Sequence, residues 1–99
     1  VQVKVLPITD RALGYADEIA KQLDGAGFRV EVDGRNEKIG KKIREATLEK
    51  IPYMLVVGDR DMENGTVSLR LRSGEDKGAM SLADFEAIIS EDVRTKVIQ

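Results

Sequence analysis

The chain has 99 residues, of which 41% are hydrophobic and 34% are charged, and its formal net charge is −2 at pH 7. This composition suits one globular domain with a single core. The chain has no cysteine and no histidine, which excludes zinc fingers, disulfide scaffolds and Ser-His-Asp or Cys-His catalytic sites. We therefore expect no catalytic residue, no metal site and no cofactor within it.

Hydropathy and the first residue predict a cytoplasmic domain from a longer protein. No apolar run approaches the roughly 20 residues that span a bilayer, and no basic stretch followed by an apolar segment opens the chain. The first residue is Val1 and not methionine. We expect residues 1–99 to be a single domain and a fragment of a longer chain.

The first half of the chain is predicted to form strand, helix, strand and helix. Alternating apolar residues indicate a strand over Val1–Leu6. A Thr9-Asp10 pair offers a side-chain cap to a helix that ends near Gly25. Phe28–Asp33 alternates again, and Asn36 can cap a second helix that runs to about Lys50.

The second half begins with a strand that is apolar on both faces, Ile51–Val57, as expected of a central strand. Asn64-Gly65 then predicts a hairpin turn into Thr66–Arg72. Residues 73–80 are expected to hold a turn and one short strand. Ser81 and Asp84 resemble a capping box for a final helix, whose inward stripe is predicted to be Leu82, Phe85, Ile88, Ile89 and Val93.

The predicted order βαβαβββα describes an α/β fold in three layers, with a mixed, mostly parallel five-stranded sheet flanked by three helices. Right-handed crossovers place the first three strands parallel in the spatial order two, one, three, with the hairpin strand beyond strand three. Ligands bind such sheets beyond the carboxyl ends of the parallel strands. We expect residues 7–10, 33–38 and 58–63 to form that edge.

Two motifs have alternative interpretations. Gly25-Ala26-Gly27 is similar to the start of a dinucleotide fingerprint, but it closes a helix and precedes a strand, so helix termination is favoured. Asp59 directly follows a strand and could be the phospho-acceptor of a receiver-like domain. Such a site needs further carboxylates to hold magnesium, and Asp10 alone does not supply them.

Positive charge is concentrated in and just before the second predicted helix. Residues 35–50 hold six basic and three acidic residues, a net charge of +3, whereas the other 83 residues, with 10 basic and 15 acidic, sum to −5. A basic face on an acidic body attracts an anionic ligand at close range. The same face also fits a solvated helix surface with i,i+4 pairs, such as Lys41 with Glu45.

Side chains of mixed charge are expected to converge near this edge. Arg70 and Arg72 lie on the polar face of the hairpin strand, and Asp61 lies in the preceding loop. Guanidinium and carboxylate groups can read base edges, whereas lysines alone cannot. Gly40 lowers helix propensity inside the second helix, which fits either a ligand that approaches the backbone or close helix–sheet packing.

Three strings of residues closely resemble a known family. They are GRNEKIGKKIREA (34–46), IPYMLVVGD (51–59) and NGTV (64–67), and they resemble the C-terminal anticodon-binding domain of bacterial-type threonyl-tRNA synthetases, in the class IIa synthetase anticodon-binding family. The resemblance covers essentially the whole chain. It implies a non-catalytic module that docks the anticodon loop of threonine tRNA and reads the G and U at its second and third anticodon positions.

The resemblance also implies partners and cofactors outside this chain. The parent protein is expected to be a cytoplasmic, homodimeric threonine-tRNA ligase with catalytic and editing domains in the same chain. The catalytic domain would use ATP, magnesium and a zinc ion that selects threonine.

Carried over residue by residue, the family's base-contacting positions fall on four side chains of this sequence. We expect Asp61 and Arg70 to address the G, and Asn36 and Arg44 to address the U. Asp61 stands where the family commonly has the longer Glu, so either its loop moves inward or a water bridges the gap. Backbone-contacting or supporting roles are expected for Arg35, Lys38, Lys41, Lys42 and Arg72.

Alternatives from three classes stay open at this point. The first is the same module from a glycyl, prolyl or histidyl sibling enzyme or from an accessory protein. The second is a receiver-like regulatory or phosphate-binding α/β domain centred on Asp59. The third is a protein-interaction module, which the acidic body favours.

Overall fold

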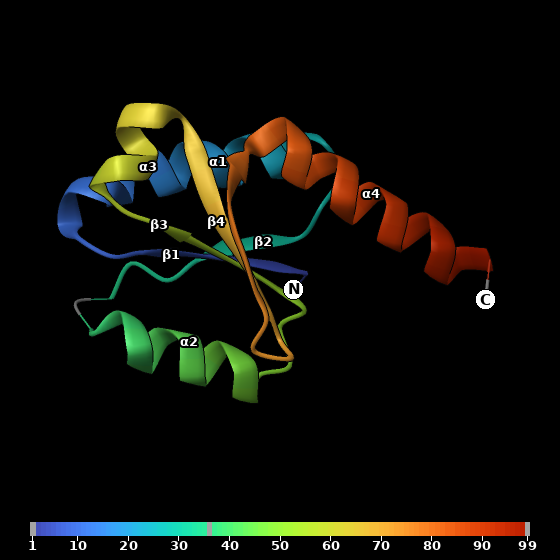
Figure 1. The fold of residues 1–99 in the computed structure, drawn as a ribbon, viewed down its shortest axis with the longest axis horizontal. Helices are drawn as coiled ribbons and strands as arrows, with labels where there is room; N and C mark the ends of the chain where they lie inside the picture. The colour runs from blue at the N-terminus through green and yellow to red at the C-terminus, as the bar shows by residue number, and fades with distance from the viewer. Residues whose placement is uncertain (1, 36, 99) are drawn as a thin grey trace.

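The computed structural model describes residues 2–35 and 37–98, with side chains as far as Glu91, so Val1, Asn36 and Gln99 lie outside the described residues. Its elements follow one another as drawn in Figure 1. They are β1 (Val3–Pro7), a 3-10 turn (Asp10–Ala12), α1 (Leu13–Gly25), β2 (Val30–Val32), α2 (Ile39–Leu48), β3 (Tyr53–Val57), α3 (Asp59–Asn64), β4 (Thr66–Leu71), β5 (Asp76–Ser81) and α4 (Leu82–Ile98).

The five strands form one mixed sheet in the order β2-β1-β3-β4-β5. β1 pairs in parallel with β2 and with β3, and β4 pairs antiparallel with both β3 and β5. Two crossover connections produce the parallel part, as the right-handed rule requires. The predicted α/β class, the strand order and the additional strand after residue 73 are therefore confirmed.

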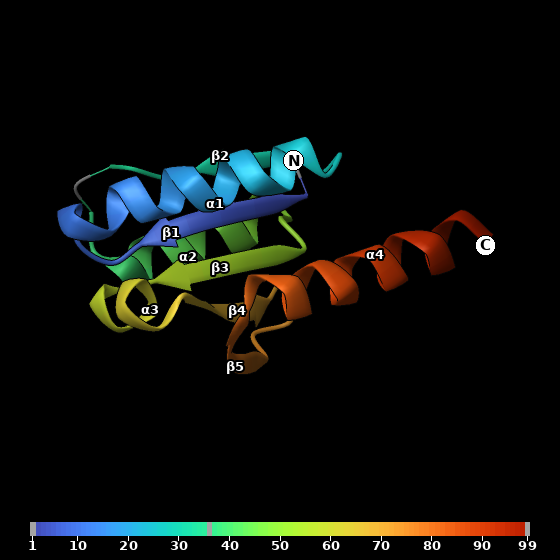
Figure 2. The same cartoon turned by 90° about the horizontal axis from the view of Figure 1, so that it is seen from above.

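Helices cover both faces of the sheet, with α1 and α4 on one side and α2 on the other (Figures 1 and 2). Residues alternate between the two faces along each strand. On β3, Tyr53 and Leu55 pack in the larger core with α1 and α4, where the ring of Phe85 lies edge-on to Tyr53 at 5.8 Å between centroids. Met54 packs in the smaller core beneath α2.

The smaller core reaches only part of the way across the sheet. Its buried members are Leu6, Ala46, Ile51 and Met54, which come from β1, α2 and the β3 region. Among the described residues, none from β4 or β5 belongs to it. The half of this face formed by β4 and β5 is consequently left beside α2 without a helix over it, and this arrangement positions the candidate site.

The clearest difference from the sequence prediction occurs at Asn64-Gly65. The segment before β4 is not a hairpin turn but a helix, α3, so the described residues contain four α-helices and not three. Gly65 adopts a left-handed conformation (φ +67°), and its N–H donates to the carbonyl of Asp61. The same glycine property that favours a tight turn therefore ends a helix.

Smaller differences occur at the element ends. Thr9 makes no side-chain cap; its hydroxyl lies 3.3 Å from a carboxylate oxygen of Asp59. α2 begins at Ile39, because Lys38 is still extended, and Ser81 caps α4 as predicted, accepting the N–H of Asp84 at 3.1 Å. Ile88, expected in the inward stripe of α4, is 37% exposed, and the side chain of Val93 lies outside the described ones.

Candidate nucleic-acid interface

A groove runs between α2 and the β4–β5 ribbon, on the half of the sheet that α2 leaves uncovered. Its volume is about 260 Å³. Apolar side chains of α2 and β3 form one wall, and polar side chains of β4 and β5 form the other. Its lining is Ile8, Ile39, Ile43, Val56, Ser68, Arg70 and Asp76.

Arg70 lies in this groove because of strand register. It is the cross-strand neighbour of Met54, so both side chains point to the face that α2 partly covers. The Arg70 side chain keeps 34% of its surface exposed, and its Nη2 lies 3.6 Å from Oδ2 of Asp76 on β5. A guanidinium in a groove with apolar walls can donate in a fixed direction to the edge of a nucleobase.

Arg44 lies on α2, the helix that forms the apolar wall of this groove, but it is not one of the lining residues. It follows the groove-lining Ile43 on α2, and its side chain is exposed. Among the described side chains, none forms an ion pair with it. Arg70 lines the groove, whereas Arg44 is an exposed residue of the helix that forms the opposite wall. Asn36, the residue expected to act with Arg44, lies outside the described residues.

Asp61 occupies a different environment from the one expected. Its side chain is only 8% exposed. Oδ2 accepts the backbone N–H of Gly58 at 3.0 Å, and Oδ1 accepts the hydroxyl of Thr66 at 2.8 Å. The carbonyl of Thr66 in turn accepts the hydroxyl of Tyr15, whose pKa is raised first by burial and then by the Asp61 charge. Asp61 thus joins the end of β3, α3 and the start of β4.

Arg35 is held by two carboxylates. It donates from Nε and Nη2 to the two oxygens of Asp33, each at 2.8 Å, and Nη2 also donates to Glu45. Hydrogen bonding from Arg35 keeps the pKa of the buried Asp33 below its ordinary value, against the effect of burial, and the same bonds raise the pKa of Arg35. This bidentate pair ties the segment between β2 and α2 to the end of β2.

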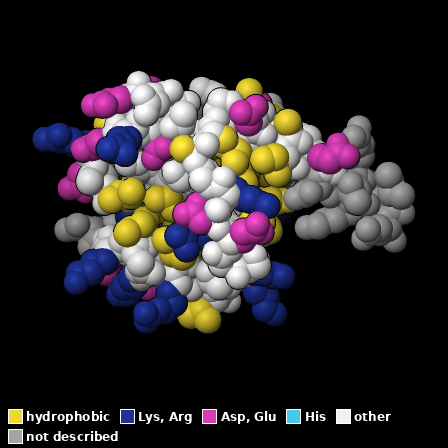
Figure 3. Space-filling view, viewed as in Figure 1, with side chains coloured by type: hydrophobic (Ala, Val, Ile, Leu, Met, Phe, Trp, Pro, Cys, Tyr) yellow, Lys and Arg dark blue, Asp and Glu magenta, His cyan; other side chains and the backbone are white. Residues whose placement is uncertain are grey.

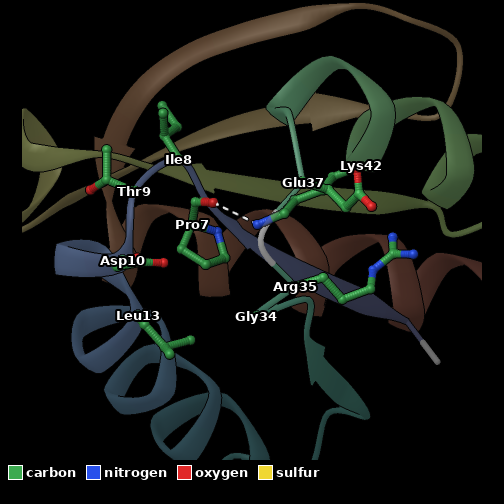
Figure 4. A pocket seen from close by; sticks show the side chains of 9 residues that line it. All are labelled: Pro7, Ile8, Thr9, Asp10, Leu13, Gly34, Arg35, Glu37 and Lys42. Atoms are coloured by element: carbon green, nitrogen blue, oxygen red, sulfur yellow. Dashed lines mark hydrogen bonds between the residues drawn. The ribbon is translucent and has the colours of Figure 1, made fainter.

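Lys42 is buried, although the sequence placed it among phosphate-contacting residues. It is 3% exposed, and its Nζ donates to the carbonyl of Pro7 at 3.0 Å. Figure 4 shows this bond in a second hollow of about 220 Å³, between the end of β1 and the start of α2, which is also lined by Arg35 and Ile8. Lys42 therefore fastens α2 to β1, and its ammonium is not available to the outer surface.

The remaining basic side chains are exposed. Lys41 pairs with Glu37 at 3.4 Å, an i,i+4 pair in place of the expected partner Glu45. Lys38 and Arg72 make no ion pair with the described side chains. Lys and Arg side chains gather along the α2 side of the molecule (Figure 3). This distribution gives an anionic ligand a basic approach to the groove.

Of the residues that line this groove, only Arg70 was named as a site residue from the sequence; Ile8 falls within the expected edge segment 7–10, and Asp76 was not singled out. Ile8 lines both hollows and is 48% exposed, an unusual position for a large apolar side chain. Asp76 lies in the segment whose sequence pattern is weakest. The residue type of Asp76 carries no signal by itself, because only the β4–β5 register brings it opposite Arg70.

Other chemistries find little support in this geometry. Among the described residues, no group of three or more acidic, Cys or His side chains is placed to hold a metal ion, which the receiver-like alternative at Asp59 requires. None of the described helices is long and apolar enough to cross a membrane.

Comparison with known proteins decides the family. The profile of the family described as "Anticodon binding domain" matches residues 2–92. The chain belongs to the anticodon-binding domain family. Among curated proteins, the domain is 58% identical over 98 residues to a "Threonine--tRNA ligase" of Desulforamulus reducens and 55% identical over 95 residues to that of Marinobacter nauticus.

These alignments cover 99% and 96% of the domain but only 15% of each relative, so the chain spans about one seventh of the length of those ligases. The domain also matches the crystal structure of the RNA-binding domain of threonyl-tRNA synthetase from Cryptosporidium parvum Iowa II. That match has a TM-score of 0.86 and 32% identity, and covers 91% of the domain and 23% of the other chain.

Proposed function

We propose that this domain binds the anticodon loop of threonine tRNA as the non-catalytic module of a threonine-tRNA ligase. The observation that carries the proposal is the groove between α2 and the β4–β5 ribbon, which Arg70 lines from β4 while Arg44 is exposed on α2. Unstacked bases of an RNA loop present hydrogen-bonding edges that such guanidinium groups can read.

In this proposal the two arginines contact different bases. Arg70, half-buried against the groove wall, addresses the G at the second anticodon position. Arg44, together with Asn36, addresses the U at the third. Apolar contacts from Ile39 and Ile43 support the base planes, a function that aromatic side chains serve in many RNA readers.

Asp61 receives a positioning role in this proposal. Both of its oxygens already accept hydrogen bonds, and the side chain is buried. It holds the turn after β3 against the start of β4, the strand that carries Arg70. To accept a hydrogen bond from the G as well, this carboxylate would have to share an oxygen that already accepts one.

The exposed cations contribute affinity without sequence information. Lys38, Lys41 and Arg72 would contact phosphates along the rim. Arg35 and Lys42 bond to groups of the domain itself: the exposed Arg35 holds the segment before α2 to Asp33, and the buried Lys42 holds α2 to β1. Binding should weaken as salt concentration rises, because each neutralised phosphate releases counterions.

The parent protein would supply the chemistry. Its catalytic and editing domains, in the same chain, would use ATP, magnesium and zinc, and two copies of the parent would form a dimer in the cytoplasm. Zinc has no place in the domain itself, because the chain lacks the Cys and His side chains that usually bind it.

Titration with anticodon stem-loops tests the proposal. The domain should prefer the threonine stem-loop to those of glycine, proline and histidine tRNAs, and changing its second or third anticodon base should weaken binding by about 1–3 kcal/mol. Equal affinity for all four loops at moderate salt would contradict it, as would preference for a sibling's loop.

A further inference from the structure

Gly40 is a glycine that the fold does not require. It is the second residue of α2, and it is exposed. It is not among the glycines with a positive φ, and a Cβ built on it meets no atom within 4 Å. Close helix–sheet packing, one of the two explanations open from the sequence, is therefore wrong. Alanine would fit here and is the better helix former.

The position of Gly40 on α2 fits the other explanation, a ligand that approaches the helix backbone. Residues three and four apart are neighbours on a helix surface, so Gly40 lies beside the groove-lining Ile43 and beside Arg44. Helical side chains lean toward the N-terminus of their helix. The Arg44 side chain can therefore extend toward the turn that contains Gly40, where a built Cβ meets no atom within 4 Å.

We propose that Gly40 is a contact point for the RNA, at which a sugar–phosphate unit of the anticodon loop lies directly on the backbone of α2. The missing side chain keeps this wall of the groove low, so that the loop can reach Arg70 on the opposite wall while Arg44 donates from α2. This inference rests on the proposed function and adds a backbone-contacting position to it.

Steric exclusion is the physical basis of the proposal. A methyl group at position 40 would occupy the free space above the helix backbone and hold the loop away from Arg70. Hydrogen bonds weaken steeply when donor and acceptor move beyond their normal separation. The penalty should therefore grow with side-chain size, while the fold gains stability from the loss of glycine.

Gly14 provides a matched control. It is the second residue of α1, as Gly40 is of α2, and a Cβ built on it also meets no atom within 4 Å. Since α1 covers the other face of the sheet (Figure 1), alanine at position 14 should remove a helix glycine without approaching the groove.

The experiment compares the wild-type chain with Gly40→Ala, Gly40→Leu and Gly14→Ala, by thermal melting and by titration with the threonine anticodon stem-loop. Both alanine variants should melt at or above the wild-type temperature. Gly40→Ala should weaken binding roughly tenfold, within the range for losing one well-formed contact. Gly40→Leu should weaken it further, and Gly14→Ala should bind as the wild type does.

Each other outcome has a definite meaning. If Gly40→Ala and Gly40→Leu bind with wild-type affinity, the contact point is refuted and the proposed function stands. If Gly40→Ala melts at a lower temperature than Gly14→Ala, and its loss of folding free energy matches its loss of binding free energy, Gly40 serves the fold and the inference is again wrong. Failure of the wild-type chain itself to prefer the threonine stem-loop would refute the proposed function, and the inference with it.

Discussion

Arg70 and Asp76 face each other across the antiparallel β4–β5 pair, with Nη2 of the arginine 3.6 Å from Oδ2 of the aspartate. Asp76 is itself fixed, because its Oδ1 accepts the backbone N–H of Gly78 at 2.8 Å. Gly78 has a φ of +81°, a conformation that favours glycine. The carboxylate thus holds the guanidinium on the groove wall and places a negative charge in the path of an RNA.

Asp76→Asn separates these two effects. The amide oxygen can still accept the Gly78 N–H, but the charge that orients Arg70 is lost. We expect affinity to rise for every RNA, since one repulsive charge is removed, and the preference for the loop with the correct central G to fall. Titrations of cognate and G-substituted stem-loops measure both. Weaker binding to both with an unchanged preference would contradict the positioning role.

Lys41 and Lys42 are adjacent in sequence and opposite in environment. Lys42→Ala should lower the free energy of unfolding by about 1–3 kcal/mol, because the buried carbonyl of Pro7 loses its partner. Lys41→Ala removes an exposed i,i+4 pair of about 0.3–0.5 kcal/mol. Urea unfolding distinguishes the two variants. A Lys42→Ala variant as stable as Lys41→Ala would show that the buried bond contributes nothing.

For RNA binding, the order should be reversed, and Lys41→Ala should have the larger effect. Lys41→Ala should weaken all stem-loops alike and reduce the slope of log affinity against log salt by about one unit. Lys42→Ala, measured where the variant is fully folded, should leave that slope unchanged. A reduced slope for Lys42→Ala would place its ammonium at a phosphate, in disagreement with its burial.

Asp33 should make stability depend on pH. Because hydrogen bonds from Arg35 lower its pKa in the folded state, the carboxylate stabilises the fold above its unfolded pKa of about 3.9. This contribution is lost as the pH falls through the folded value. The stability difference between wild type and Asp33→Asn should therefore be constant from pH 7 to about 5, and should shrink below about 4. A difference independent of pH down to 2 would contradict this assignment.

Asp61→Ala tests whether this residue positions the groove or reads a base. Loss of the Gly58 and Thr66 hydrogen bonds should lower the free energy of unfolding by about 1–2 kcal/mol. Where the variant is folded, its preference for the central G should stay above that of Arg70→Ala. Unchanged stability with a lost preference would instead make Asp61 a direct reader of the base, as the family resemblance implied.

The sequence predicted the sheet well because alternation, helical periodicity and crossover handedness are local or topological properties. The strand order and the position of Arg70 on the polar face of β4 follow from such patterns. α3 was missed because Asn64-Gly65 supplies a left-handed glycine, and a left-handed glycine serves a turn or a helix end equally well. Only the hydrogen bonds before it distinguish the two.

The site was harder to predict where it depends on contacts between distant segments. Lys42 looks like another surface lysine of a basic helix, but its ammonium meets a carbonyl 35 residues away. Asp61 looks like a loop carboxylate until Gly58 and Thr66 are placed around it. Asp76 enters the groove through strand register. The Lys42 and Asp76 contacts are not encoded in the spacing near those residues, whereas the Asp61 contacts are local and were missed because α3 was missed.

The central claim is that the groove between α2 and the β4–β5 ribbon reads the bases through Arg70. The most direct measurement is the affinity ratio between the threonine anticodon stem-loop and the same loop with its central G changed, for wild type, Arg70→Ala and Arg72→Ala. We predict that Arg70→Ala loses most of this ratio, while Arg72→Ala, at an exposed arginine just beyond the end of β4, weakens both complexes equally and keeps it. A ratio that survives in Arg70→Ala would contradict the account.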